Sequence, residues 1–542
     1  MRLILTSLFF ICLFGCNKSQ TDDVINFDEE ASQESGGTLT NAMIGEPNNL
    51  IAMIAGDGAS SAIAGQIFNS LLKYDENLEF EGDLAESWEV SKDYKTIRFN
   101  LKPQKKWSDD HPITCKDVLF TWKAVTHPDT RTPYGSDYQL VSSAECTNDY
   151  QFIAKYNEPY APALETWASL HILPEHLLKN EDINNTYFSL NPVGSNYYTL
   201  DSWVTGQQLK LKANPNAIHG KPLIDNKVSR IIPDLSSQFM ELIAGNIDLM
   251  SINPIQYSRV FPNRSELNNK INLYKEMGNG YTYFGFNLNK KPFDDINIRK
   301  AISYAIDRQE IIDGVLLGLG EEITSPYKPG TYWENKNIKK LSFNPQKAKE
   351  LLEKSGYHLN NNIYEKDGIP LSFEILTNQN KQREMTAVLI QRRLQDIGID
   401  VSIRVIEWAS FVNRFIKTGE FQAVVLGWSL SLDPDQYSIW HSSQQGQGQF
   451  NFIGYENPTV DRLLAQGRTE LDPNKRQLIY HAFAKVLLED SPIVYLSAGY
   501  GLTAMHKRIQ GIVNPIPPAG VGYDSQKWYI PKSFRRHQIS AD

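Results

Sequence analysis

The chain has 542 residues, of which 41% are hydrophobic and 22% are charged, so it has ordinary globular composition and is long enough for two or more domains. Its formal net charge of −9 argues against a protein that binds the phosphate backbone of nucleic acids. Beyond that exclusion, the charge balance indicates only good solubility.

The N-terminus carries a predicted export signal. A basic start leads into the apolar run Leu3–Phe14, which is too short to span a bilayer but is typical of a signal peptide. The run ends in a Leu-Phe-Gly-Cys sequence that resembles a bacterial lipoprotein box, with Cys16 as the lipidated first residue of the mature protein; the alternative is an ordinary signal peptide cleaved nearby. We therefore predict a lipoprotein signal peptide over residues 1–16, a periplasmic or otherwise extracytoplasmic location, and a polar flexible tether over residues 17–37.

The fold is predicted to begin with a strand, a loop and a helix. Thr38–Met43 is the expected strand, and the loop Gly45–Leu50 follows it. The next apolar positions predict a helix that contains Ile63, Ile67, Leu71 and Leu72.

The stretch Asp83–Trp122 is predicted to form strand, turn, strand, turn and helix. Ile97, Phe99 and Leu101 alternate with polar residues, which is the pattern of a half-buried strand. An aspartate follows Thr114 by three positions, just ahead of an apolar run. This spacing indicates a helix start at which the threonine hydroxyl accepts a hydrogen bond from an orphan backbone N–H.

Two cysteines, Cys115 and Cys146, remain once the two in the export signal are set aside. In an oxidising compartment an isolated pair favours a disulfide, and the alternative is two buried thiols. No histidine stands at ligand spacing from them, so no metal site is expected.

The stretch from Asp83 onward also carries a long sequence signature. Its positions are Leu84, Ala85, Ser87, Trp88, Ser91, Asp93, Phe99, Leu101, Trp107, Ser108, Asp109, Pro112, Thr114, Asp117, Val118, Phe120 and Trp122. The signature resembles that of the family 5 solute-binding proteins of ABC importers, the oligopeptide- and dipeptide-binding group. Asp110 stands where the family has a turn glycine, and Cys115 where it has a small residue. The resemblance extends over roughly the whole chain after residue 37.

This resemblance implies an α/β fold with two lobes, of the periplasmic-binding-protein type (class II, with an enlarged lobe I), mixed sheets covered by helices on both faces, and two hinge strands. Lobe I is expected over residues 38–283 and again over 494–542, with lobe II over 284–493. The implied partners are an oligopeptide ligand and the permease subunits of an ABC transporter. We expect no cofactor, no metal, no nucleic acid and no catalysis, and a monomer held at the membrane by its N-terminal lipid.

Lobe II has the clearest periodicity. Leu371–Ile375 and Val401–Val405 alternate as strands, Met385–Ile397 forms a helix, and Phe421–Gly427 is a nearly continuous apolar strand. Strands that alternate with helices predict a parallel sheet covered on both faces. In such sheets ligands bind beyond the carboxyl ends of the strands.

The loop after the last of these strands is the predicted centre of the ligand site. By the resemblance it lines the cleft and its backbone pairs with an extended ligand, and its candidate residues are Trp428, Ser429, Leu430, Ser431 and Asp433. Ser431 stands near the place where dipeptide and oligopeptide binders often carry an aspartate for the ligand amine. Two roles stay open for Asp433: it replaces that aspartate, or it caps a helix together with Pro434.

The region that would hold an arginine for a dipeptide's carboxylate reads Thr377–Asn380 and contains none. Both departures favour longer peptides gripped through their backbone, or a non-peptide ligand.

Further candidates carry two interpretations each. In the functional interpretation Trp408 and Trp428 form side-chain pockets or stack on a ligand. In the structural interpretation they pack in the core or at the rim of the cleft. Asn451 faces the cleft or stabilises a turn. Glu46 and Asn48 face the cleft from lobe I, or their loop is a plain connection; Tyr283, on an aromatic strand where the chain passes between lobes, is the last candidate.

The function these features predict is capture of oligopeptides in a closing cleft and delivery to a membrane permease. The alternative keeps the transport role but changes the ligand to an oligosaccharide, an opine or chelated nickel. A more distant alternative is a hydrolase, for which the sequence offers no nucleophile–base arrangement with supporting context.

Overall fold

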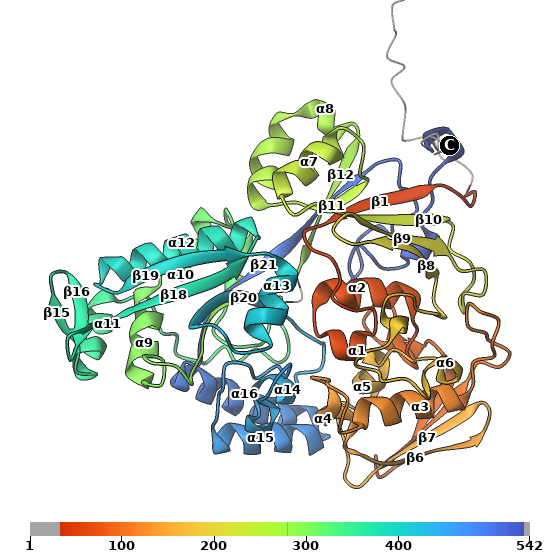
Figure 1. Ribbon diagram of the computed structural model, residues 1–542, viewed down its shortest axis with the longest axis horizontal. Helices are drawn as coiled ribbons and strands as arrows, with labels where there is room; N and C mark the ends of the chain where they lie inside the picture. The colour runs from red at the N-terminus through yellow and green to blue at the C-terminus, as the bar shows by residue number, and fades with distance from the viewer. Residues whose placement is uncertain (1–32, 279, 536–542) are drawn as a thin grey trace, which may run out of the picture.

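The computed structural model describes residues 33–278 and 280–535, so the predicted signal peptide, Cys16 and residues 17–32 of the predicted tether lie outside the described part. Two α/β lobes lie side by side in Figure 1: lobe I in red to yellow-green, and lobe II in green, cyan and light blue. The long strand β21 (Ile493–His506) runs from one to the other. None of the described helices combines the length and the hydropathy that crossing a bilayer requires.

The main sheet of lobe I is built on the first strand of the fold. Its strands, in spatial order, are β21, β11 (Leu249–Ser251), β1 (Thr38–Met43), β10 (Asn226–Ile231), β9 (Gln208–Ala213) and β8 (Tyr198–Val204), with β12 (Ile271–Met277) paired to β21. β1 has the predicted bounds and runs parallel to β10 and β11, whereas the other pairs are antiparallel.

A second, smaller sheet gives lobe I its enlarged part. Its order is β4 (Ala85–Val90), β5 (Thr96–Leu101), β7 (Gln151–Tyr156) and β6 (Val141–Asn148). Burial alternates along β5 as predicted. Helix α3 (Cys115–Thr126) begins after Thr114, and the predicted capping box is present. The disulfide Cys115–Cys146, with Cα atoms 5.8 Å apart, ties the start of α3 to β6.

The first long helix is shorter than predicted. The remaining elements of lobe I are α1 (Ala52–Ala55), α2 (Gly58–Ile67), β2 (Leu72–Tyr74), β3 (Phe80–Gly82), α4 (Gly135–Tyr138), α5 (Ala163–Ser169), α6 (Glu175–Leu178), α7 (Leu235–Ile243) and α8 (Ser265–Asn268). The prediction that α2 continues through Leu71 and Leu72 is wrong. Phe68 is extended, and Leu72 pairs with Gly82 in a two-stranded sheet. Both leucines are fully buried, so their apolar spacing reflects the core and not a helix period.

The sheet of lobe II confirms the predicted parallel unit and adds an antiparallel part. Its strands are β19 (Asp400–Ile406), β18 (Ser372–Asn378), β20 (Ala423–Ser429), β13 (Gly280–Phe286) and β21, with β14 (Gly320–Glu322) on β21. β18 is parallel to β19 and β20, whereas β13 is antiparallel to both of its neighbours. Because β13 enters from lobe I and β21 leaves toward it, the sheet is mixed.

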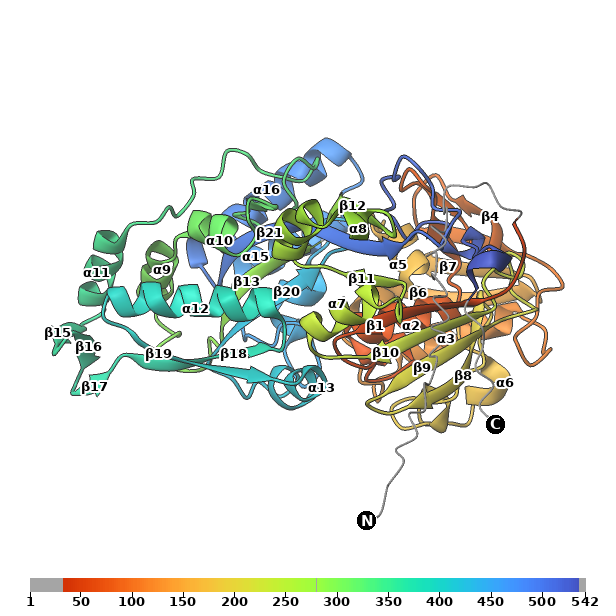
Figure 2. The same cartoon turned by 90° about the horizontal axis from the view of Figure 1, so that it is seen from above.

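Helices cover this sheet on both faces. They are α9 (Ile296–Ala305), α10 (Arg308–Gly314), α11 (Pro345–Lys354), α12 (Lys381–Asp396), α13 (Trp408–Ser410) with the π-helical turn Phe411–Ile416, α14 (Tyr437–Trp440), α15 (Pro458–Thr469) and α16 (Pro473–Asp490). Figure 2 shows α12 lying along β18 and β19. The strands β15 (His358–Asn360), β16 (Ile363–Lys366) and β17 (Ile369–Pro370) form a separate small sheet.

The crossing strand β21 belongs to both lobes. Near its start Val494 lies opposite Phe284 of β13, and near its end Ala504 lies opposite Met250 of β11. Gly499 and Gly501 stand between the two halves. The second crossing is the direct step from β12 to β13. Two adjacent crossings leave the rest of the lobes free to face one another across a gap.

Candidate functional site

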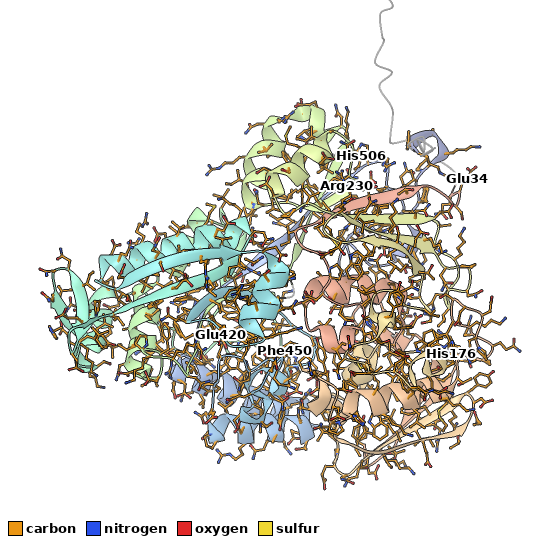
Figure 3. All side chains as sticks on the ribbon, viewed as in Figure 1. Glu34, His176, Arg230, Glu420, Phe450 and His506 are labelled. Atoms are coloured by element: carbon orange, nitrogen blue, oxygen red, sulfur yellow. A yellow bond between two sulfur atoms is a disulfide. The ribbon has the colours of Figure 1, made fainter. Side chains whose placement is uncertain are left out.

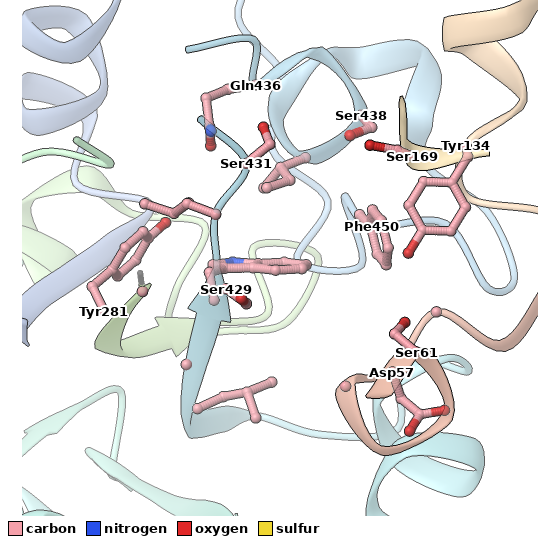
Figure 4. Close-up of a pocket in the computed structure, with 18 of the residues that line it drawn as sticks. Asp57, Ser61, Tyr134, Ser169, Tyr281, Ser429, Ser431, Gln436, Ser438 and Phe450 are labelled. Carbon is pink, nitrogen blue, oxygen red and sulfur yellow. The ribbon is translucent and has the colours of Figure 1, made fainter. Parts of the chain in front are cut away.

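A cavity of about 1070 Å³ lies between the lobes (Figure 4). Lobe I lines it with α1, α2, α4 and α5, and lobe II with β20, the start of α12 and the segment after α13. The crossing strands supply Tyr281 and Tyr500. The cavity is therefore walled by both lobes and floored by the strands that join them.

The loop after β20 stands where the sequence predicts it. Trp428, Ser429, Leu430, Ser431 and Asp433 all line the cavity. The loop lies at the carboxyl end of β20, the parallel partner of β18, which is the expected place for a ligand in such a sheet. Figure 4 shows Ser429 and Ser431 on one side of the cavity and Asp57 and Ser61 of lobe I on the other.

The two predicted tryptophans also line the cavity. One face of Trp428 stacks on Tyr283, with ring centroids 6.4 Å apart, and its edge meets Phe450. Trp408 packs against the backbone of Gly45, so closely that a Cβ there would come within 2.9 Å of the tryptophan Cβ. Both tryptophans thus combine packing with exposure to the cavity, and a ligand contact by either stays a prediction.

Four other predicted residues are not among those that line the cavity. The carboxylate of Glu46 accepts hydrogen bonds from Trp203 Nε1 and the Gly206 N–H. The side-chain amide of Asn48 donates to Asp57, and Tyr283 is buried behind Trp428. Their contact with a ligand stays a prediction.

Asn451, the fourth of these residues, stabilises a turn. Its amide nitrogen donates to the carbonyl oxygens of His441 and Tyr455, and its oxygen accepts from the Tyr455 N–H at 2.9 Å. The side chain is almost fully buried. These three bonds use the amide inside the protein.

The carboxylate of Asp433 is held by Arg476. The guanidinium donates two hydrogen bonds of 2.7 Å to it, and both side chains are largely buried. The interpretation of Asp433 as a helix cap is wrong, because the next helix begins at Tyr437 after Gln436. Asp433 instead accepts the Asp435 N–H in a turn. The Asp433-Pro434 sequence therefore forms a turn, and Arg476 of α16 stabilises this turn through its hydrogen bonds to Asp433.

Arg383 is a cavity residue that the sequence pattern missed. Its guanidinium lines the cavity, lies 3.0 Å from the place where a Cβ of Gly427 would stand, and donates to Asn378 Oδ1. Burial lowers its pKa to about 10. The helix cap at Asn380 was the available signal, since a side chain in the first turn of a helix points back toward the preceding strand end.

Lobe I adds two half-buried titratable groups to the cavity wall, Glu165 and His171, which the sequence did not single out. Burial, and to a lesser extent the charge of Asp433, raises the pKa of Glu165 to about 7. Burial lowers the pKa of His171 to about 4, so this histidine is neutral at pH 7.

Polar contacts close the lobes over the cavity. Arg468 of α15 donates to Asp435 Oδ2 and Ser136 O, and it also pairs with Asp137 of α4. Its own carbonyl accepts the Ala161 N–H at 2.8 Å. The pKa of Asp137 is raised to about 6, mainly by burial and to a smaller extent by the nearby carboxylate of Asp435. The positive charge of Arg468 acts in the opposite direction.

Other contacts between the lobes accompany the ion pair of Arg468 with Asp137. Gln449 Nε2 donates to Thr132 O at 2.9 Å, and Asn413 Nδ2 donates to Asn48 Oδ1 at 2.8 Å. The ring of Phe450 meets Tyr134 edge-on, with centroids 5.3 Å apart. Phe450 stands at the junction of the lobes in Figure 3 and lies beside Tyr134 in Figure 4. The structure is therefore the closed arrangement.

Two α/β lobes that are joined by crossing strands and closed over a cavity define a solute-binding protein of the periplasmic type. The chain belongs to the bacterial extracellular solute-binding proteins, family 5, whose model (described as "family 5 Middle") matches residues 79–450. The family comprises substrate-binding proteins of transport systems.

Known members resemble the chain over nearly its full length. The oligopeptide-binding protein AppA of Bacillus subtilis is 31% identical, with 98% of each chain covered, and its structure in complex with a nonapeptide has a TM-score of 0.86 over 92% of this chain and 100% of that one. NikZ from Campylobacter jejuni, solved with Ni(L-His), is 26% identical, with a TM-score of 0.82 over 91% and 99%. AgaA from A. tumefaciens R10, solved with agropinic acid, is 26% identical, with a TM-score of 0.80 over 91% and 99%.

Proposed function

We propose that this protein captures oligopeptides in the interlobe cavity and passes them unaltered to the permease of an ABC transporter. The observation that carries the proposal is the interlobe cavity of about 1070 Å³, which is slightly larger than the usual ligand sites of about 300–1,000 Å³. The similarity to AppA, which binds a nonapeptide in its solved structure, supports the same ligand class. Arg383, on the lobe II wall, offers a cation for a peptide carboxylate or carbonyl.

The experiment is native mass spectrometry of the full chain purified without a denaturation step. We expect a ladder of bound masses that tandem fragmentation resolves into peptides of several lengths. A single sugar or opine mass, or a nickel chelate, would transfer the proposal to the alternative ligands, which the similarity to NikZ and AgaA supports. Turnover of added peptide or ester substrates would instead revive the hydrolase alternative.

The place of the protein in the cell is part of the same proposal. Cys16 is lipidated and becomes the first residue of the mature protein once residues 1–15 are removed, and residues 17–37 tether a monomeric binding protein to the outer side of a membrane. Changing Cys16→Ser should release the protein from the membrane fraction and abolish incorporation of labelled palmitate. Retention of the label by the variant would contradict the anchor.

We propose that the lobes divide within the crossing strands, with residues 38–283 and 494–542 in lobe I and 284–493 in lobe II. The pairing of β21 with β13 near its start and with β11 near its end supports this division. Small-angle scattering should show a more compact protein with a peptide bound than without it. The same profile in both states would contradict a closing hinge.

A further inference from the structure

Glu165 lies on the cavity side of α5. Ser169, one helical turn later, lines the cavity with it, and Figure 4 shows Ser169 pointing into the space opposite Ser438 of lobe II. Thr166 and Leu170 line the same wall. The helix therefore presents one polar face to whatever fills the cavity.

The carboxylate of Glu165 has no partner in the part of the chain that the structure describes. Its Oε2 atom is buried without a hydrogen bond, and no described lysine, arginine or histidine lies within ion-pair distance of it. Burial is the larger cause of its raised pKa, and the charge that adds to it is another anion, Asp433. A charged carboxylate with one oxygen buried in this condition is disfavoured unless a partner arrives.

Every other acidic side chain of the cavity wall has such a partner. Asp57 accepts from Ser60 Oγ and Asn48, Asp433 is held by Arg476, and Asp137 and Asp435 share Arg468. Among the acids that line the cavity, Glu165 is thus the one whose hydrogen-bonding capacity the described residues leave unused.

We propose that Glu165 is a specificity residue that binds a positively charged nitrogen of the ligand, an ammonium or guanidinium group. This assignment rests on the proposed peptide-binding function and deepens it: the preferred peptides are cationic, through a free N-terminus or through a lysine or arginine side chain. The group would complete the empty hydrogen bond of Oε2 and restore the charge balance of the wall.

The position of Glu165 also couples this contact to closure. Glu165 belongs to lobe I and Asp433 to lobe II, and the electrostatic influence of one on the other means that closure brings two acidic groups together. A cation near Glu165 offsets this repulsion in the closed state. A ligand with such a group therefore favours the closed form more than a neutral ligand of the same size does.

The test compares the full chain, stripped of ligand, with its Glu165→Gln variant. The probes are alanine-based peptides that carry one lysine or, as the neutral match, one norleucine, each with a free or an acetylated N-terminus. They compete for the protein as an equimolar mixture, and native mass spectrometry reads the retained set. Glu158→Gln is the matched control, because Glu158 is exposed on lobe I and, among the described residues, forms its ion pair with Lys95 at the surface.

The wild-type protein and the Glu158→Gln control should retain cationic peptides about tenfold over their neutral matches, the ratio that a charge-assisted bond of about 1.4 kcal/mol gives. Glu165→Gln should lower this preference to within about twofold. The acetylation and lysine arms show which nitrogen is bound. Melting of the ligand-free variants at or above the wild-type temperature shows that the fold is intact.

An undiminished preference in Glu165→Gln would overturn the assignment, as would peptide binding by the wild-type protein without any charge preference. Failure of every peptide to bind would overturn the proposed peptide function itself. The two failures are distinguishable because only the second affects neutral and cationic probes alike.

Discussion

The two walls of the cavity hold their acidic side chains in different ways. On lobe II, Asp433 receives two hydrogen bonds of 2.7 Å from Arg476, so its charge is used within the protein. On lobe I, Glu165 has no such partner among the described residues. Asp137 is intermediate, because it shares Arg468 with Asp435 across the lobe boundary. Pairing within a lobe serves the fold, pairing between lobes serves closure, and an unpaired acid is available to a ligand.

The largest change in stability that tests this comparison is expected on the lobe II wall, at the pair formed by Asp433 and Arg476. Arg476→Met leaves the largely buried carboxylate of Asp433 without its cation, and the loss of one partner of a buried pair costs about 3–5 kcal/mol of unfolding free energy. Urea unfolding at pH 7 measures it.

Arg462→Met is the matched control, because Arg462 is exposed on the neighbouring helix α15 and should change stability by at most about 0.5 kcal/mol. Adding Asp433→Asn to Arg476→Met should recover part of the loss, since it removes the unpaired charge. A loss of less than about 1 kcal/mol in Arg476→Met would show that the pair is not what stabilises this wall.

A smaller change in stability, which depends on pH, is expected at Asp137, the acid that shares Arg468 with Asp435. Because the pKa of Asp137 rises from its ordinary 3.8 to about 6 in the closed protein, the closed protein binds a proton that the unfolded chain has lost. This contribution to stability is fully present below about pH 4 and is lost as the pH rises through 6.

The measurement is urea unfolding of the wild-type protein and Asp137→Asn at pH 7 and pH 5. The variant should be the more stable of the two at pH 7, and its advantage should shrink by about 1 kcal/mol at pH 5. Taking the difference between the proteins removes other titrations, such as that of His171, whose lowered pKa acts in the opposite direction. An advantage that does not change with pH would assign the effect to shape and not to charge.

The sequence predicted the lobe II wall more fully than the lobe I wall. The nearly continuous apolar run of β20 identified a buried strand, and a buried strand of a parallel unit places its following loop at the ligand edge. Two lobes, the parallel unit of lobe II and the crossing strands follow from the signature and the periodicity together.

The remaining cavity residues depend on packing between segments that are distant in the sequence. Glu165 lies on a helix of seven residues, and only the closure of lobe II makes its environment a cavity. Arg383 reaches the site because the first turn of α12 points its side chain back over β18. The cap alternative for Asp433 arose because the proline that suggested it is adjacent, whereas its partner Arg476 is 43 residues away.

The smallest change in stability is expected at Glu165, and it is a gain, whereas the substitution of Arg476 causes a loss. Glu165→Gln replaces a half-buried carboxylate, which has no partner among the described residues, with a neutral group of the same shape, so the ligand-free protein should gain up to about 1 kcal/mol. The gain should be greatest above pH 7, where the carboxylate is ionised in the native state, and should shrink below that pH. Urea unfolding of stripped protein at pH 8 and pH 6 measures both. A loss of stability at pH 8 would mean that the ionised carboxylate has a stabilising partner inside the protein, and the contrast between the two walls would then disappear.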